Sequence, residues 1–412
     1  MSNQPREQSE RTEPDYLSKY ATYSTALPGS SRQHPQEKDD FRTEFERDYT
    51  RILHSRAFRR LRHKTQVFID PKNDHICSRL EHSLHVASVA RTISKALRLN
   101  NDLVAAIAIG HDLGHAPFGH MGERTLNEIA QEHGASFYHE LHSLRIVDRL
   151  ESPYASFDYA GLNLTFAVRD GIACHYGEGF EPRLTPNRQK EPASLESMKR
   201  GASMPATLEG CVVRWADKVA YIGRDLEDAL TLGLVKEADI PANVRNVLKI
   251  ADIRTCNGSV ISALIHEVYA NSVEQDAIQI GEEVHAALND LYAFNMDRIY
   301  RSEIATKGAS EIKVAMRAMF EYVLCMLIDA ENNPRRIGTN SNKYHQVLSE
   351  FLANDVVYWQ KASSAKLTTD FIAGMTDSFF VDFYNELIAY PKNLAPLEAA
   401  TPLTRPLWEP TV

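Results

Sequence analysis

The sequence has few cysteines, no long apolar run and no excess of positive charge, and each absence excludes a class of protein. Its five cysteines are scattered over 412 residues without a Cys-x-x-Cys pair, which indicates reduced thiols rather than a disulfide framework. No segment reaches the roughly 18 apolar residues that a membrane helix needs, and the polar first residues lack an apolar signal segment. We therefore expect a cytoplasmic protein with no membrane association.

The charge balance also limits the partners. The net charge is −9, whereas a general nucleic-acid binder carries an excess of basic residues, so any anion site must be a local patch. The apolar fraction of 43% and the charged fraction of 25% are typical of a globular protein with a large buried core.

Helical periodicity dominates the remaining pattern. Apolar residues recur at steps of three and four over residues 80–97, 208–226 and 314–326, which is the spacing of helices with one buried face. Convincing alternation of apolar and polar residues, as in strands, is hard to find. The sequence therefore predicts an all-α protein.

Composition shifts suggest boundaries along the chain. Residues 1–40 are polar and rich in Ser, Gln, Glu and Pro, so we expect them to be mostly disordered. We expect a helical core over residues 41–330 and a helical C-terminal extension with a Pro-rich tail over residues 331–412. Residues 176–206 hold many Gly, Pro and charged residues, and such long irregular excursions are often functional lids.

The densest group of chemically active residues is the run from His111 to Glu123. It holds three His, one Asp and one Glu in 13 residues, directly after an apolar helical segment. His111 and Asp112 cannot both enter a core without partners, since an isolated buried carboxylate is very costly, and a divalent metal would satisfy both. A His-Asp pair alone is more often a surface feature, but so many titratable groups on an apolar frame favour a site.

Two other helical segments offer further ligands. His82 lies in an amphipathic segment, one turn after Arg79, although a single helical His is usually structural. In the segment 214–225, Asp217, Tyr221 and Asp225 fall within about 80° of one helix face at 100° per residue, with Lys218 at its edge. A solvated face with ion pairs between turns would give the same pattern.

These residues follow the H…HD…D order of the HD-domain metallohydrolases. The string HDLGHAPFGHMGE at 111–123, with RLEHSL at 79–84 before it, resembles the bacterial deoxyguanosine triphosphate triphosphohydrolase-like family. The strings RILHSRAFRRLRHKTQVF at 51–68, SLRIV at 143–147, GLNLT at 161–165 and LEG at 208–210 resemble the same family. The resemblance is dense over residues 41–240 and looser to about residue 330.

The resemblance implies an HD-domain helical core and a role for each matching residue. It implies a divalent metal such as Mn, Mg or Fe, a catalytic pair with further histidines near the phosphates, a phosphate-binding pair, and a sugar-binding set. The implied metal ligands are His82, His111, Asp112 and Asp217; the catalytic residues are His120 and Glu123 with His115 and His139; the substrate-binding residues are Arg79 and Lys218 for phosphate and Gln66, Tyr221 and Asp225 for the sugar.

The implied reaction is hydrolysis of deoxynucleoside triphosphates to a deoxynucleoside and inorganic triphosphate. The resemblance also implies a homo-oligomer, a tetramer or hexamer. A deoxynucleotide is a candidate activator, and single-stranded nucleic acid is a secondary candidate ligand. Two alternatives stay open. One is another HD phosphohydrolase, a nucleotidase or phosphodiesterase, and the other is a non-catalytic regulator that binds nucleotides or single-stranded nucleic acid.

Overall fold

The computed structural model describes residues 4–66, 77–151, 159–176, 180–250, 256–306, 308–332, 343–353 and 355–389. Their regular structure is almost entirely helical, which confirms the all-α prediction. The only named strands among these residues are β1 (Arg183–Leu184) and β2 (Ile278–Gln279), which form one antiparallel pair. No helix in the described part of the chain is long and apolar enough to cross a membrane.

The chain divides into two compact units, which are described separately. The first comprises residues 1–54, 81–112 and 162–302. Its helices are α1 (Pro5–Tyr16), α2 (Glu44–Leu53), most of α4 (Arg79–Ala96), α5 (Asn101–Gly110), α8 (Phe166–Cys174), α9 (Leu208–Thr231), α10 (Ala242–Val247), α11 (Cys256–Ser272) and α12 (Glu282–Asn295), with short turns η3 (Pro192–Leu195), η4 (Glu237–Asp239) and η6 (Met296–Tyr300).

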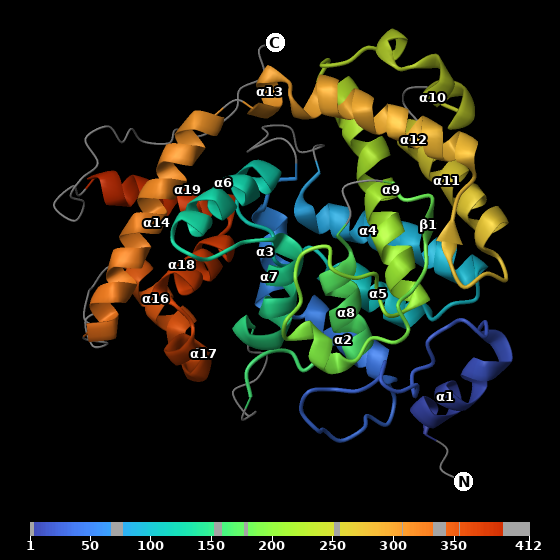
Figure 1. Ribbon diagram of the computed structural model, residues 1–412, viewed down its shortest axis with the longest axis horizontal. Helices are drawn as coiled ribbons and strands as arrows, with labels where there is room; N and C mark the ends of the chain where they lie inside the picture. The colour runs from blue at the N-terminus through green and yellow to red at the C-terminus, as the bar shows by residue number, and fades with distance from the viewer. Residues whose placement is uncertain are drawn as a thin grey trace. The chain divides into compact units, whose positions relative to one another are not determined.

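Helix α5 is the centre of the first unit. It packs against α2, α8 and α9 (Figure 1), and every residue from Leu103 to Gly110 is buried. Two glycines allow α5 and α8 to approach closely, since a Cβ on Gly110 would lie 2.6 Å from Ile172 Cδ1 and one on Gly171 would lie 2.5 Å from Ile107 Cδ1. This close packing fixes the C-terminal end of α5, where His111 follows.

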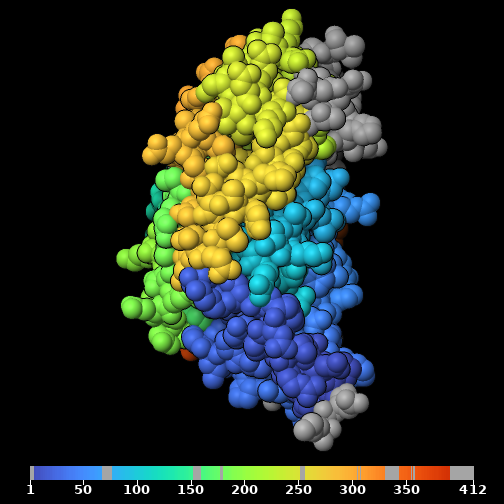
Figure 2. Space-filling view, turned by 90° about the vertical axis from the view of Figure 1, so that its right-hand side faces the viewer, coloured from blue at the N-terminus to red at the C-terminus, as the bar shows by residue number. Residues whose placement is uncertain are grey.

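The N-terminal segment differs from the mostly disordered one expected for residues 1–40. Residues 5–16 form α1, and the backbone N–H of Ser18 donates to Arg98 O. The segment lies on the surface beside the C-terminal end of α4 (Figure 2). Although this segment is polar in composition, some of its side chains are buried. Glu13 and Ser24 are both buried, and the carboxylate of Glu13 accepts hydrogen bonds from the N–H and hydroxyl of Ser24.

The second unit comprises residues 55–80, 113–161 and 303–412. Its helices are α3 (Arg56–Arg60), α6 (Gly119–Glu132), α7 (His139–Arg145), α13 (Glu303–Thr306), α14 (Ala309–Asn332), α16 (Lys343–Ala353), α17 (Val356–Lys361), α18 (Ser364–Ala373) and α19 (Asp377–Ala389), with turns η1 (Leu61–His63) and η2 (Ile146–Leu150). Buried side chains of α6, α14, α16, α18 and α19 form one hydrophobic core.

This division differs from the expected boundaries at residues 40 and 330. The C-terminal helices do not form a separate extension, because Phe380 and Met319 share their core with Phe118 and Leu126. Sequence composition could not show this arrangement, since it depends on contacts between residues far apart in the chain. The Pro-rich tail falls outside the described residues.

Candidate active site

The end of α5 positions His111 as a potential metal ligand. His111 is fully buried, and its Nδ1–H donates to Ala108 O at 2.6 Å. This hydrogen bond leaves the lone pair of Nε2 to act as a ligand, as is usual for metal-binding histidines. His175 repeats the arrangement at the end of α8, where its Nδ1–H donates to Ile172 O at 2.6 Å. The two rings pack edge to face with centroids 5.0 Å apart.

The structure brings the four predicted metal ligands together. Nε2 of His82 lies 2.9 Å from Asp217 Oδ1 and 3.9 Å from Asp112 Oδ2. Nε2 of His111 lies 3.5 Å from Asp112 Oδ1 and 3.6 Å from Asp217 Oδ1. Ligand atoms at right angles around a cation, with bonds of about 2.1 Å, are about 3 Å apart. These four side chains therefore need only small adjustments to hold one ion.

Electrostatics favour a cation at this place. Burial opposes ionisation of Asp217, but His111 and His82 hold the pKa of its carboxyl well below the usual range. Burial likewise opposes protonation of His111, while Asp112 and Asp217 raise the pKa of its imidazole. Two carboxylates in a buried cluster are costly unless a positive charge balances them. The donor set of two imidazoles and two carboxylates suits a borderline divalent metal such as Mn or Fe.

A second cluster of titratable groups lies in the other unit, in and after the loop at residues 113–118. The loop is held by Asp377, whose carboxylate accepts hydrogen bonds from the N–H of Phe118 and of Thr65, each at 3.0 Å. Gly114 is required there, because a Cβ would lie 2.2 Å from Ser143 N. Gly122 lies in the first turn of α6, and a Cβ at that position would lie 1.8 Å from Pro117 O.

The predicted catalytic residues gather at the start of α6 and α7. His120 lies in the first turn of α6, with a side chain that is 61% exposed and Nδ1 3.6 Å from Glu123 Oε2. The carboxylate of Glu123 also accepts from the ring Nδ1–H of His139, at 2.9 and 3.0 Å, and from its backbone N–H at 3.0 Å. His115 stacks on His139 with ring centroids 4.0 Å apart.

These four residues have different electrostatic environments. Burial and the nearby cation of Arg79 hold the pKa of His115 well below its ordinary value, so this imidazole is neutral near pH 7. Burial opposes ionisation of Glu123, but His139 and His120 hold the pKa of its carboxyl well below the usual range. Burial lowers the pKa of His120, and Glu123 opposes this shift. Glu123 is therefore an ionised acceptor that can orient His120 and favour its protonated form.

The two predicted phosphate-binding residues, Arg79 and Lys218, are buried, and each donates a hydrogen bond. Arg79 begins α4, three residues before His82, and its Nε–H donates to Thr65 O at 3.2 Å. Lys218 lies on α9 directly after Asp217, and its Nζ donates to Glu181 Oε2 at 2.7 Å. Glu181 also pairs with Arg214, one turn before Lys218, at 2.5 Å. Sequence reasoning identified neither Glu181 nor this role for Arg214.

The predicted sugar-binding residues have distinct surroundings. Tyr221 and Asp225 lie one turn apart on α9, as the helical spacing predicted, and the Tyr300 hydroxyl donates to Asp225 Oδ2 at 2.6 Å. Burial, together with the carboxylates of Asp217 and Asp225, holds the pKa of Tyr221 well above its ordinary value, so the phenol stays neutral. Gln66 is buried, and its Oε1 has no hydrogen-bond partner among the described residues.

Comparison with known proteins identifies the family of this chain. The family model described as HD domain matches residues 79–222. A deoxyguanosinetriphosphate triphosphohydrolase-like protein of Caldanaerobacter subterraneus subsp. tengcongensis is 36% identical over 93% of this chain and 95% of its own length. Proteins of the same name from Desulfatibacillum aliphaticivorans and Clostridium tetani are 36% and 33% identical, over 93% and 85% of this chain and 97% and 87% of their own lengths.

The chain belongs to the deoxyguanosinetriphosphate triphosphohydrolase-like family. The resemblance inferred from the motifs is thereby confirmed. This member of the triphosphohydrolase-like family also contains side chains near the motif residues that sequence reasoning missed. His175 could have been found, because, like His111, it directly follows an apolar helix. No sequence pattern indicated Tyr300 or Glu181. Tyr300 bonds to Asp225, and Glu181 to Lys218, through contacts between parts of the chain that are far apart in the sequence.

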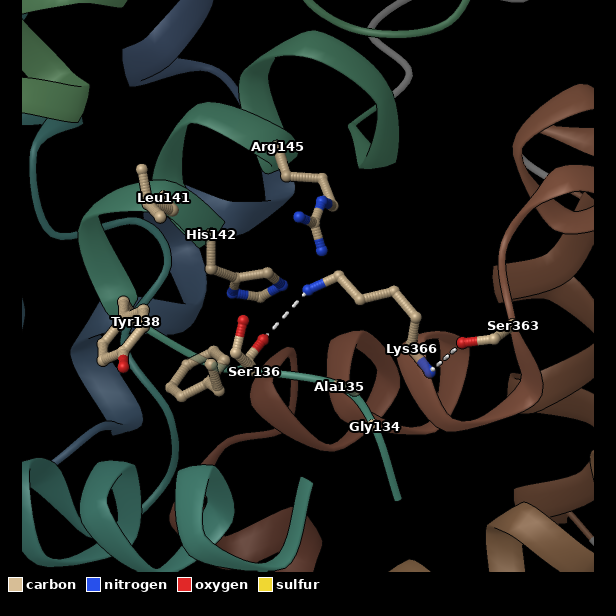
Figure 3. Close-up of a pocket in the computed structure, with 10 residues that line it drawn as sticks. Gly134, Ala135, Ser136, Tyr138, Leu141, His142, Arg145, Ser363 and Lys366 are labelled. Carbon is tan, nitrogen blue, oxygen red and sulfur yellow. Dashed lines mark hydrogen bonds between the residues drawn. The ribbon is translucent and has the colours of Figure 1, made fainter. Parts of the chain in front are cut away.

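One cavity in this triphosphohydrolase-like chain is lined by other residues than the predicted ones. It has a volume of about 320 Å³ and lies in the second unit, between residues 134–145 and the start of α18 (Figure 3). Arg145 and Lys366 point into it, and Lys366 Nζ donates to Ser136 O at 3.3 Å. Both cations also pair with buried Asp370, at 2.9 and 3.4 Å, so much of their charge is already balanced. None of the predicted site residues lines the cavity.

Proposed function

We propose that this chain is a metal-dependent phosphohydrolase that cleaves deoxynucleoside triphosphates into a deoxynucleoside and inorganic triphosphate. The observation that carries the proposal is the set of buried His82, His111 and Asp112 with partly buried Asp217, in a member of the triphosphohydrolase-like family. Their paired donor atoms lie 2.9–3.9 Å apart. The relatives' name supplies the substrate class, and this ligand set supplies the chemistry.

The proposed metal site uses side chains from three helical segments. His82 from α4, His111 and Asp112 at the end of α5, and Asp217 from α9 would hold the ion. When bound, a divalent cation supplies Lewis-acid chemistry to the α-phosphate. The Nδ1–H bond from His111 to Ala108 keeps the ring in the tautomer that presents Nε2.

We assign proton transfer to His120. The departing 5′-oxygen of the sugar is a poor leaving group unless it receives a proton, and an imidazolium is suited to donate one near neutral pH. His120 is the most exposed member of its cluster, and Glu123 can hold the imidazolium charge. His115 is neutral and buried, so its role is to pack against His139 and to hydrogen-bond phosphate oxygens.

The remaining residues bind the substrate. Arg79 and Lys218 provide positive charge for the phosphates, and the guanidinium fork of Arg79 suits paired phosphate oxygens. Asp225, already held by Tyr300, accepts a hydrogen bond from the 3′-hydroxyl. Tyr221 packs its ring against the 2′ carbon, and the buried Oε1 of Gln66 gains a donor when the sugar binds.

The decisive experiment is a product assay with the four deoxynucleoside triphosphates, alone and in pairs, followed by anion-exchange separation. We expect inorganic triphosphate and a deoxynucleoside in equal amounts. Pairs in which one nucleotide accelerates turnover of another would reveal the proposed deoxynucleotide activation. Release of a nucleoside monophosphate with pyrophosphate, or of phosphate alone, would instead identify another HD phosphohydrolase. Light scattering would test the proposed tetramer or hexamer in the same samples.

A further inference from the structure

A single carboxylate bridges two buried cations on one face of α9. Arg214 and Lys218 are one helical turn apart, and Glu181 reaches both. Its Oε1 lies 2.5 Å from Arg214 Nη2 and its Oε2 lies 2.7 Å from Lys218 Nζ. The cationic side chains are 8% and 3% exposed, whereas the Glu181 side chain is 33% exposed. The anion is therefore the solvent-facing member of the group.

The backbone on both sides of Glu181 is anchored. Phe180 is buried beside Trp215, and its carbonyl accepts a hydrogen bond from His285 Nε2–H at 2.5 Å. Pro182 O accepts from the N–H of Ile280 at 3.0 Å, and the pair of β1 with β2 follows at once. A rotation of the Glu181 side chain can thus uncover the cations without any movement of the surrounding segment.

Arg214 retains capacity for another acceptor. Its Nη2 pairs with Glu181 and its Nη1 donates weakly to Cys174 O at 3.4 Å. Its Nε is buried and has no hydrogen-bond partner in the part of the chain that the structure describes. A carboxylate satisfies part of this guanidinium, whereas a phosphate chain offers more oxygens in the same space.

We propose that Arg214 joins Lys218 as a binding residue for the substrate's triphosphate, and that Glu181 occupies this cation pair until the triphosphate displaces it. The inference rests on the proposed function, in which Lys218 binds phosphate. Glu181 acts as an internal competitor. It keeps two buried cations paired when substrate is absent, and it lowers the affinity for anions that cannot displace it. Because the two cations lie next to metal ligand Asp217 on α9, a phosphate held by the ion is within their reach.

The test measures binding of inorganic triphosphate by calorimetry to the full-length protein, with the same excess of Mg²⁺ in every sample. Glu181→Gln keeps the size of the side chain and removes the competing charge. If Glu181 is paired with Arg214 and Lys218 in about nine-tenths of the molecules, this variant should bind inorganic triphosphate about tenfold more tightly than wild type. Glu181→Asp keeps the charge but is too short to bridge both cations, so it should show a smaller gain and provides a second test if Glu181→Gln fails to fold.

Two controls separate direct competition from a general change in charge. Glu196→Gln removes an exposed carboxylate from the same irregular segment and should leave the affinity unchanged. Arg214→Gln introduced into Glu181→Gln should abolish most of the gain, as expected for residues that act together. An equal gain in Glu196→Gln, no gain in folded Glu181→Gln or Glu181→Asp, or a full gain without Arg214 would each overturn the inference.

This readout is independent of catalysis, so the two proposals can fail separately. A wild-type protein that hydrolyses no deoxynucleotide, while its Glu181→Gln variant gains affinity for inorganic triphosphate, would refute the proposed activity and retain the anion site. Active wild type with no change in triphosphate binding would retain the activity and refute the role of Glu181.

Discussion

The hydroxyl of Tyr300 donates a 2.6 Å hydrogen bond to Asp225 Oδ2, although 75 residues separate the two in the chain. This contact fixes the carboxylate to which we assign the 3′-hydroxyl of the sugar. It also leaves Tyr221, one turn earlier on α9, as the aromatic side chain available to contact the neighbouring 2′ carbon. The choice between deoxyribose and ribose can therefore be tested at Tyr221.

Replacing Tyr221 with Ala should narrow the preference for deoxynucleotides. Excluding a 2′-hydroxyl that finds no partner is worth about 1–3 kcal/mol, or about 5- to 150-fold in kcat/KM. The measurement is the ratio of kcat/KM for dGTP over GTP, or for the preferred base, in wild type, Tyr221→Ala and Tyr221→Phe. Phe should preserve the ratio because it keeps the ring. If Ala lowers both rates equally, Tyr221 is a packing residue and does not select the sugar.

Asp112→Ala should lose bound metal and nearly all turnover while the protein remains folded. Removing one of two carboxylates from the cluster removes both a ligand and half of the charge that attracts the cation. Elemental analysis of purified protein and circular dichroism would measure metal content and folding. Asp297→Ala, which changes an exposed carboxylate, should retain both metal and activity. Full metal occupancy in Asp112→Ala would remove Asp112 from the site.

His120→Ala should retain metal and substrate binding but lose about 10²–10⁴ in kcat, the usual contribution of a positioned acid or base. The exposed position of His120 makes a large loss of stability unexpected. Single-turnover kinetics would separate chemistry from binding, and His266→Ala, at an exposed position on α11, provides a control. A loss of less than tenfold would assign the acid to another group, with His115 the first candidate.

Lys190→Met should destabilise the first unit. Lys190 lies in the irregular segment after α8, and its Nζ donates to Asp170 Oδ1 at 2.5 Å and to Met204 O at 3.0 Å. Both members of the pair are buried, so the change leaves an uncompensated carboxylate at a cost of about 3–5 kcal/mol. Urea unfolding would measure the loss. The double variant Lys190→Met, Asp170→Asn should recover part of it, and no recovery would show that the charge is not the cause.

The buried imidazole of His142 should make stability depend on pH. Burial lowers the pKa of His142 to about 4, although the Asp370 carboxylate opposes this shift. The unfolded chain takes up this proton near pH 6.5 while the folded chain does not, so stability decreases as the pH falls from about 6.5 to about 4. Between pH 6.5 and 5 the contribution is about 2 kcal/mol.

The matched variant for this prediction is His142→Asn. The amide of Asn can replace the Nδ1–H bond that His142 donates to Gly114 O at 2.9 Å, and it does not titrate. Urea unfolding at pH 7, 6 and 5 should therefore show a smaller loss of stability in the variant than in wild type. Identical slopes in the two proteins would assign the acid sensitivity to other groups.

The local pattern of the sequence predicted the parts of the structure that depend on helical spacing. Asp217, Tyr221 and Asp225 lie on one helix because residues four apart share a face. Contacts between irregular segments were not predictable in this way. Glu181 pairs with Arg214, 33 residues later in the chain, and with Lys218, 37 residues later. No periodic pattern in the sequence connects these positions. The sequence analysis predicted disorder for residues 1–40 because their composition is polar. Residues 4–40 are instead ordered, and Glu13 and Ser24 are buried against each other.

The carboxylate of Glu209, in the first turn of α9, is fully buried and accepts hydrogen bonds from the N–H and hydroxyl of Thr22 and from the N–H of Asn100. Two of its three donors therefore come from the N-terminal segment. A shortened protein that begins near residue 41 would lose both donors from Thr22 to this carboxylate, which lies in the first turn of the helix that carries Asp217. Recombinant design should accordingly place purification tags at the C-terminal end and leave the N-terminal segment intact.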